Sequence, residues 1–272
     1  MYPMKPQIGE PLNTDHPLAR GLVGAWLFNE RGGLTAHDLS GNKNHGTLTS
    51  MDPATDWVPE GLTFDGVNDW IDIGLNKPIT GDFSFAVRAR VNVSLAADQR
   101  VVSMVPGNNT NNWVVLWMDT GDGADGWAFS VINGGAQSVV GKTSPTAVQG
   151  AWSNIVCTSD LSAGTAIYVD GALIDTDGTT TAAKTLTGID VAVWTAASDW
   201  GQIDVDYLHL YNRVLAASEV SALYLDPYAA FRLPTRTFSF GAAAAAGYPI
   251  RLIGPGGLVG PGGLVGAPGL VA

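Results

Sequence analysis

The chain has 272 residues, a length that one large all-β domain with extensions commonly fills. Apolar residues make up 46% of it and charged residues only 14%, which allows a core and excludes wholesale disorder. The formal net charge of −11 argues against nucleic acid or anionic membrane as a partner, because binding to either depends on lysine and arginine.

Residues 1–19 are rich in proline and predict an extended N-terminal arm that is ordered only by packing on a neighbour. The prolines also interrupt any apolar run of the kind that a signal peptide needs, so we expect no Sec export signal. No stretch of the chain approaches the uninterrupted apolar length of a membrane span.

From residue 21 to about 214, short β-type runs follow one another, each closed by a Gly, Asn, Asp or Pro turn signal. The clearest runs lie at 22–28, 70–73, 83–91, 113–118, 127–131, 165–169, 191–194 and 203–211. In 83–91, apolar side chains alternate with Ser84, Arg88 and Arg90, which predicts a strand with one buried face. Many short strands at this spacing predict a sandwich or barrel, with a single helix over 216–224.

The composition changes after residue 227, since every acidic residue precedes that point. Glycine then occupies every third position, at Gly254, Gly257, Gly260, Gly263, Gly266 and Gly269. Gly-X-Y spacing is what a collagen-like triple helix of polyproline-II chains requires, and a globular head would raise the effective concentration of the strands. We therefore assign these glycines to oligomerisation, as a trimer. A flexible Gly/Pro-rich or elastin-like tail, and a polyproline-II arm laid on another subunit, remain open.

Four stretches in the first 226 residues resemble a known family in the correct order. They are 21–30 with the loop 38–46, the hairpin 62–71, the strand pair 152–156 and 167–173, and the closing segment 201–215. Together they resemble the laminin-G-like members of the concanavalin-A-like jelly-roll superfamily, which implies an all-β, two-sheet antiparallel sandwich. The expected division is 1–19 extended arm, 20–228 jelly roll, 229–253 Ala/Gly-rich linker, and 254–272 polyproline-II or collagen-like tail.

The resemblance also implies one cofactor. Related jelly rolls often hold a structural calcium between an early loop and the last strand, which would make Asp206 a ligand, with backbone carbonyls and Asp65 completing an oxygen shell. The residues alone equally allow a plainer role for the loop carboxylates and amides, because Asp38, Asn42 and Asn44 can cap loop amides. No other cofactor is expected.

The acidic residues do not form a catalytic pattern. Glycoside hydrolases of this superfamily present paired carboxylates as E-x-D-x-x-E, which the four isolated glutamates of this chain cannot supply. The histidine spacing of a zinc site, a G-x-S-x-G elbow and a phosphate-binding loop are also missing from the sequence. We therefore predict that the chain is not an enzyme.

Tryptophan is the most informative residue type for binding. Nine tryptophans are many, and aromatic faces stack on sugar rings, although core packing also accounts for such residues. The candidates for glycan contact are Trp113, Trp117 and Trp127.

The combination favours a non-catalytic structural protein of a virus particle, such as a phage capsid decoration or fibre, by analogy at the level of the fold. It would oligomerise through its tail, contact other virion proteins and display a head that binds cell-surface glycans, after assembly in the host cytoplasm. The alternative is a carbohydrate-binding adhesion module of a bacterial surface or extracellular protein. A polysaccharide hydrolase ranks last.

Overall fold

Two antiparallel β-sheets form the first of two compact units, Met1–Leu233, and the second unit is Pro234–Ala272. The computed structural model describes residues 2–92, 98–104, 112–120, 126–134, 136–141, 148–195 and 198–232, and the backbone of 251–253 and 257–259. In the second unit, the described strands β19 (Arg251–Ile253) and β20 (Gly257–Val259) pair antiparallel.

Sheet A has the strand order β14-β13-β12-β7-β18-β5-β4, and β1 also pairs with β18. Its strands are β1 (Leu22–Trp26), β4 (Trp57–Val58), β5 (Gly61–Thr63), β7 (Phe83–Val91), β12 (Ser153–Asp160), β13 (Gly164–Val169), β14 (Ala172–Asp177) and β18 (Ile203–Tyr211). The pairing of β7 with both β12 and β18 joins segments far apart in the sequence.

Sheet B has the order β11-β10-β9-β8-β15-β6-β3-β2. Its strands are β2 (Thr35–Ala36), β3 (Gly46–Thr49), β6 (Trp70–Thr80), β8 (Gln99–Met104), β9 (Asn112–Asp119), β10 (Gly126–Asn133), β11 (Ala136–Val140) and β15 (Thr185–Val191). A hairpin of β16 (Val193–Thr195) and β17 (Ser198–Trp200) lies beside β8. The two-sheet antiparallel sandwich predicted from the sequence is confirmed.

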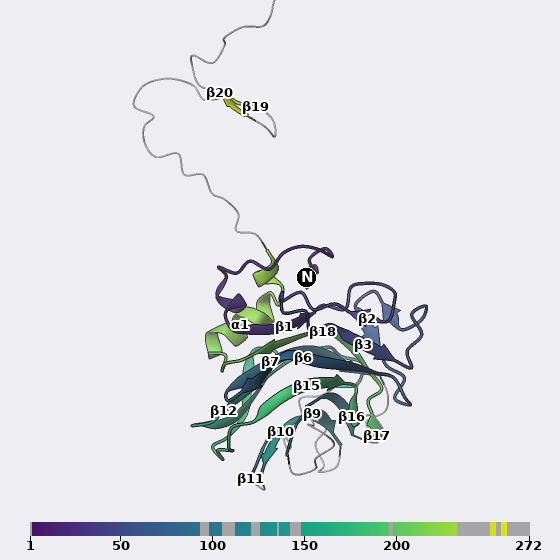
Figure 1. Cartoon of the computed structure of the whole chain (residues 1–272), viewed down its shortest axis with the longest axis vertical. Coiled ribbons are helices and arrows are strands. Elements are labelled where there is room, and N and C mark those ends of the chain that lie inside the picture. Colours follow the sequence, from purple (N-terminus) through teal and green to yellow (C-terminus); the bar gives the residue numbers. More distant parts are fainter. Residues whose placement is uncertain are drawn as a thin grey trace, which may run out of the picture. The chain divides into compact units, whose positions relative to one another are not determined.

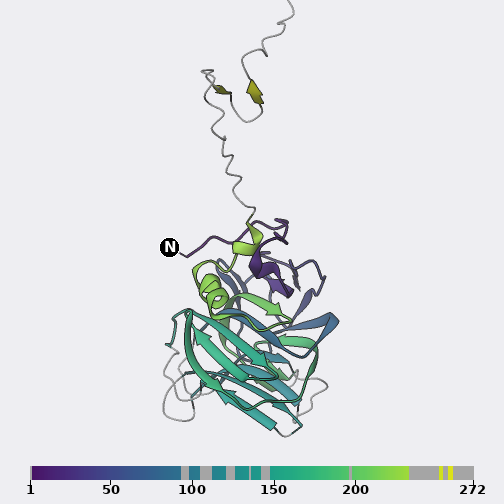
Figure 2. The ribbon, with the colours of Figure 1, turned by 90° about the vertical axis from the view of Figure 1, so that its left-hand side faces the viewer.

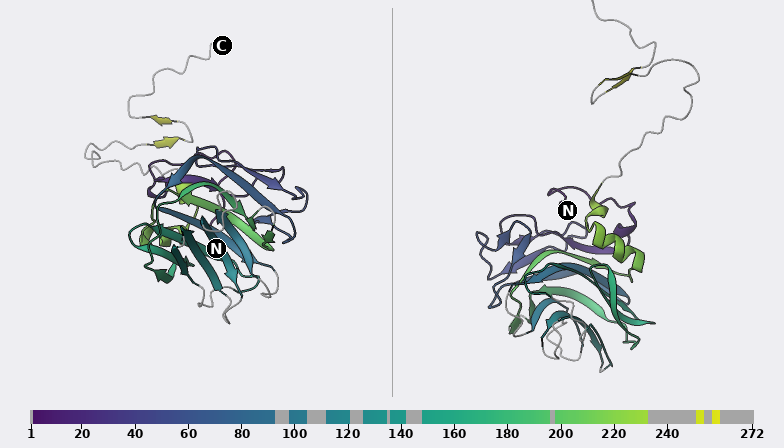
Figure 3. Two further views of the ribbon diagram at one scale, coloured as in Figure 1. Left: turned by 60° about the horizontal axis from the view of Figure 1, so that its bottom comes forward. Right: turned by 180° about the vertical axis from the view of Figure 1, so that it is seen from behind.

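The two sheets stack as arched layers, with sheet B on the inner side of the arch (Figures 1 and 3). The main core lies between them, where Phe85 of β7 meets Phe129 of β10 edge to face, with ring centroids 5.5 Å apart. Burial of these apolar faces against each other is the principal stabilising force in such a sandwich.

A second apolar cluster covers the outer face of sheet A. The helix α1 (Ala217–Leu225), at the position predicted from the sequence, buries Val220 and Leu223 there, and the same side carries the short 3₁₀ turns Pro17–Ala19 and Ala229–Phe231 (Figure 2). Ala86 of β7 lies in this cluster. The prediction that β7 has one solvent-facing side is therefore wrong for residues 83–87, all of which are buried.

The N-terminal arm packs on its own jelly roll. The amide of Asn13 donates to the carbonyl of Ala230 at 2.8 Å, and Leu18 is buried in the cluster under α1. The arm is thus ordered by contacts within the first unit.

The early loop caps its own backbone, as one of the two sequence interpretations proposed. Asp38 accepts hydrogen bonds from the amides of Ala25, Ser40 and Asn44, while Trp26 Nε1 donates to the Asn44 carbonyl at 2.8 Å. Within the described residues, no helix is both long enough and apolar enough to cross a membrane.

Candidate functional site

The outer face of sheet B carries a group of tryptophans around β9. Alternation along β9 sends Val114, Leu116 and Met118 into the core and places Trp113, Val115 and Trp117 on the opposite face. The structure therefore brings together two of the predicted glycan-binding residues. Trp113 is partly exposed, whereas Trp117 is only 7% exposed.

Two further side chains complete what we call the tryptophan cluster: Trp113, Trp117, Trp194 and Arg100. Trp194 of β16 meets Trp113 edge to face, with ring centroids 4.1 Å apart. The Arg100 guanidinium of β8 lies 5.9 Å from the Trp117 ring centre and 5.3 Å from that of Trp194. Packed rings of this kind form a preorganised aromatic surface with a cation beside it.

Trp127 does not belong to this cluster, and the strand register gives the reason. Directly opposed residues of an antiparallel pair share one face of the sheet. Trp127 pairs with Met118, a core residue, whereas Trp117 pairs with Ala128. Trp127 accordingly lies between the sheets, at 1% exposure. This corrects its grouping with Trp113 and Trp117.

Two carboxylates face each other elsewhere on the outer face of sheet B. Asp190 of β15 is paired with Asp72 of β6 and, on its other side, with Ser103 of β8. Burial, and then the nearby Asp72 charge, raise the pKa of Asp190 to about 7. At neutral pH this face therefore offers both acceptor and donor oxygens.

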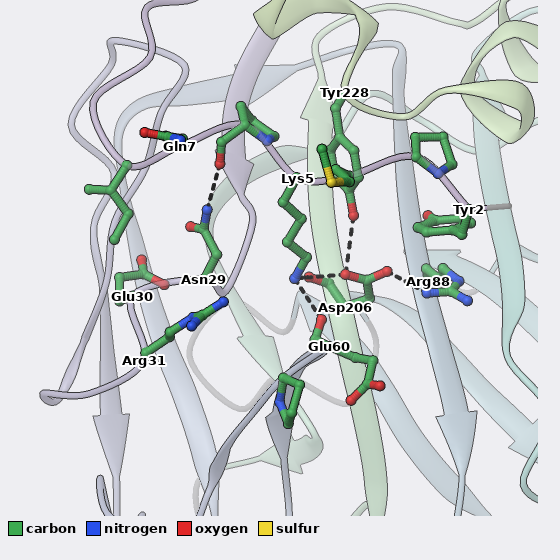
Figure 4. A pocket seen from close by; sticks show the side chains of 15 residues that line it. Tyr2, Lys5, Gln7, Asn29, Glu30, Arg31, Glu60, Arg88, Asp206 and Tyr228 are labelled. Atoms are coloured by element: carbon green, nitrogen blue, oxygen red, sulfur yellow. Dashed lines mark hydrogen bonds and ion pairs between the residues drawn. The ribbon is translucent and has the colours of Figure 1, made fainter.

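Asp206, the predicted calcium ligand, lies at a cavity of about 650 Å³ between the N-terminal arm and sheet A (Figure 4). Its carboxylate is 2% exposed and is bound by two cations: Lys5 Nζ at 2.7 Å from Oδ1 and Arg88 at 2.5 Å from Oδ2. The Tyr228 hydroxyl donates to Oδ1 at 3.1 Å, and the Arg88 guanidinium lies over the Tyr2 ring.

Lys5 Nζ also donates hydrogen bonds to three backbone carbonyl oxygens. They belong to Leu27 at 2.5 Å, Glu60 at 2.6 Å and Asp206 at 2.7 Å. Burial lowers the pKa of Lys5, and the Asp206 charge partly offsets this effect. Carbonyl and carboxylate oxygens are the donor set that Ca²⁺ takes, so the residues suit a hard cation. In this structure the Lys5 ammonium lies at the centre of that set.

Asp65, the second expected ligand, lies in the turn before β6. Its Oδ1 accepts hydrogen bonds from the amides of Val67 and Asn68 in the same turn, at 2.7 and 3.3 Å. Among the described residues, no group of three or more His, Cys, Asp or Glu side chains could hold a metal ion. Asp65 therefore acts as a turn cap here.

The oligomerisation glycines lie almost entirely outside the described residues. Only Gly257 is described, at the start of β20 opposite Ile253, whereas Gly254, Gly260, Gly263, Gly266 and Gly269 are not. Their assignment stays a prediction.

The sequence did not indicate Arg100, Asp190 or Lys5 as residues of a functional site. The partners of Asp190 come from strands distant in the sequence, and most partners of Lys5 are backbone carbonyls, which leave no side-chain signal. Trp194 belongs to the predicted run 191–194, but only the folded structure shows that it packs against Trp113.

Comparison with solved structures gives matches of modest similarity. The Trypanosoma rangeli sialidase in complex with sialic acid is 17% identical, with a TM-score of 0.58, over 77% of this chain and 33% of that one. The receptor-binding domain of botulinum neurotoxin C/D mosaic serotype is 11% identical, with a TM-score of 0.60, over 75% and 51%. The binding domain of botulinum neurotoxin serotype G is 15% identical, with a TM-score of 0.59, over 75% and 50%. This chain thus spans a third to a half of their lengths, and the likeness concerns the fold.

No curated protein matches the chain. The family model of the concanavalin A-like lectin/glucanases superfamily, of the laminin-G type, matches residues 65–221, which is more than half of the sequence. The matched region runs from the turn before β6 to the middle of α1, through both sheets. The chain therefore belongs to the concanavalin A-like lectin/glucanases superfamily.

Proposed function

We propose that the jelly roll is a non-catalytic carbohydrate-binding head that uses the outer face of sheet B. The observation that carries this proposal is the tryptophan cluster, in which the rings of Trp113 and Trp194 are only partly buried. Partly exposed aromatic rings on a sheet face are suited to the apolar faces of pyranose rings.

Polar groups on the same face supply partners for sugar hydroxyls. Asp72 and Asp190 offer acceptor oxygens opposite each other, and the Arg100 guanidinium offers donors beside the rings.

The structural neighbours agree with this class of ligand. One neighbour is a sialidase in complex with sialic acid, and another is botulinum neurotoxin type C, whose cell entry depends on interaction with two ganglioside molecules. Those ligands belong to those proteins, and the specificity of this chain has to be found by screening.

We propose binding without turnover. Asp72 and Asp190 are the one opposed acidic pair described on this face, and we assign them to hydroxyl recognition because they come from two strands rather than from one E-x-D-x-x-E strand. An oligosaccharide recovered intact after long incubation with the protein would agree with this assignment, whereas release of reducing ends would refute it.

We further propose that the head is displayed on a virus particle by an oligomerising C-terminal segment, as a capsid decoration or fibre would be. The Gly-X-Y spacing from Gly254 to Gly269 supports this role, because glycine at every third position allows three polyproline-II chains to wind together. The adhesion module of an extracellular protein is the alternative setting for the same head, and the two settings share the carbohydrate-binding function.

A glycan array probed with the full-length protein tests the binding proposal. We expect discrete positive glycans, with at least tenfold weaker signals for Trp113→Ala because the ring loses its stacking contact. Trp152→Ala is a matched control, since Trp152 is also partly exposed but stacks on Arg88 and Arg90 of sheet A. An array without signal, or equal losses in both variants, would contradict the proposal.

A further inference from the structure

The oxygens around Lys5 Nζ come from three separate segments of the chain. They are the carbonyls of Leu27, Glu60 and Asp206 at 2.5–2.7 Å, the Asp206 carboxylate at 2.7 Å and, farther away, the Phe28 carbonyl at 3.5 Å. We call this set the oxygen cage. It joins the end of β1, the turn before β5 and the middle of β18. Figure 4 shows Lys5 with its contacts to Glu60 and Asp206.

Three backbone irregularities aim these oxygens at one point. Phe28 has a φ of 47°, a left-handed conformation that a bulky residue rarely adopts, and the carbonyls of residues 27 and 28 both face Lys5. Asp206 is the extra residue of a bulge in β18, between Val205 and Tyr207, so its carbonyl and its carboxylate both reach Nζ.

The third irregularity is a close approach of two backbones. A Cβ atom on Gly61 would lie 2.1 Å from the Val205 carbonyl oxygen, so glycine is needed there to bring the Glu60 carbonyl against β18. Strained or special backbone at three unrelated places indicates that the cage is a built feature of the fold.

The cage offers more acceptors than an ammonium can use. Four oxygens lie within 2.7 Å of Nζ, whereas a lysine has only three N–H donors. A spherical cation has no such limit, and Ca²⁺ binds oxygens of this kind at about 2.3–2.6 Å. Carbonyl oxygens converging on one point repel each other unless a positive charge lies between them.

We propose that Lys5 is a tethered cation: its ammonium takes the place in the oxygen cage that a calcium ion would otherwise fill. The arm and a metal ion then compete for one position. The wild-type chain consequently needs no calcium, and the contact that replaces the metal also fastens the N-terminal arm to the last strand of sheet A. This inference is independent of the carbohydrate-binding proposal.

Thermal unfolding of the full-length protein tests the inference, with Lys5→Met as the variant and Lys77→Met, an exposed lysine of β6, as the matched control. Wild type and Lys77→Met should have the same Tm in 5 mM CaCl₂ and in EDTA. Lys5→Met should have a lower Tm in EDTA and regain roughly 5–10 °C in calcium, as expected for a ligand at ~100 times its Kd.

Two results would overturn the proposal: a calcium-dependent rise in the Tm of the wild type, or no calcium response in folded Lys5→Met. If Lys5→Met fails to fold without calcium and folds with it, the proposal is supported. If that variant folds under neither condition, calorimetric titration of the wild type with CaCl₂ decides, because binding would show that Lys5 does not hold the site and no heat would support the tethered cation.

Discussion

At the scale of single residues, Asp190 shows most clearly how the fold changes a side chain's chemistry. It is partly buried on sheet B, directly opposite Asp72, and its pKa rises from 3.8 to about 7. An acid with a raised pKa in the folded state favours folding at low pH, and this contribution is lost as the pH rises from about 4 to about 7. The Asp190 carboxylate therefore lowers the stability of the folded state above this pH range.

Replacing that carboxylate should reveal the cost. Asp190→Asn should raise the free energy of unfolding at pH 8 by about 1–2 kcal/mol, a value discounted for solvent screening of a partly exposed pair. The two proteins should be equally stable near pH 4, where Asp190 is protonated in the folded state. Denaturant unfolding at both pH values measures this, and a variant less stable than wild type at pH 8 would contradict the assignment.

The residues of the site were predictable only in part. Alternation within one strand correctly joined Trp113 to Trp117, because both lie in β9 with even spacing. It could not place Trp127, whose face depends on the register between β9 and β10. Lys5 left no signal, since its role depends on carbonyl directions that only the folded backbone defines.

At the scale of elements, one charged pair joins the first turn of α1 to the segment that follows β18. Arg213 makes two hydrogen bonds of 2.7 Å with Glu219, which also accepts from the Ala216 amide at the start of the helix. These hydrogen bonds lower the pKa of Glu219, and the largest contribution comes from Arg213. Such a group stabilises the fold above its unfolded pKa, and this stability is lost as the pH falls through its folded value.

Glu219→Gln should therefore destabilise the protein at pH 7 by about 1–2 kcal/mol, because one charged pair and part of the helix N-terminal capping are lost. The difference from wild type should shrink on acidification towards pH 3. Urea unfolding at pH 7 and pH 3 measures both effects, with Ser218→Ala, an exposed position of the same turn, as the control. A difference that persists unchanged at pH 3 would exclude the charge as its cause.

The long strands were partly predictable, since Gly and Asp turn signals bound the runs. The strands β8 and β11 were in none of the predicted runs, and the run 191–194 covers the end of β15 and the start of β16. The strand β6 was expected over 70–73 and extends to Thr80. A proline usually interrupts a strand, but Pro78 lies beside the place where the register between β6 and β15 shifts, between Leu186 and Gly188. Proline is tolerated at such places because no ladder hydrogen bond from its nitrogen is needed.

At the scale of the whole molecule, the jelly roll can be explained from its own residues. The first unit buries a core between its sheets and a second one under α1. The triple helix proposed for the Gly-X-Y triplets would instead require three chains. Residue spacing could predict the sandwich, because its signals are local. It left the tail open, because the same Gly-X-Y spacing fits a triple helix, a flexible tail and a polyproline-II arm laid on another subunit.

The oligomerisation proposal makes a direct prediction. The full-length chain should elute as a trimer, with three times the 28.4 kDa chain mass by light scattering, and residues 1–232 should elute as a monomer. Gly263→Ala should weaken the trimer because only glycine fits the crowded axis of a triple helix, whereas Val265→Ala should not. Monomers of both the full-length and the shortened chain would contradict the proposal.

The most direct test of carbohydrate binding by sheet B is the crystal structure of the protein with an oligosaccharide chosen from the array. We expect a sugar ring packed on Trp113 and Trp194, with its hydroxyls towards Arg100 or Asp190. A sugar bound instead in the cavity beside Asp206, or on sheet A around Trp152, would contradict the account.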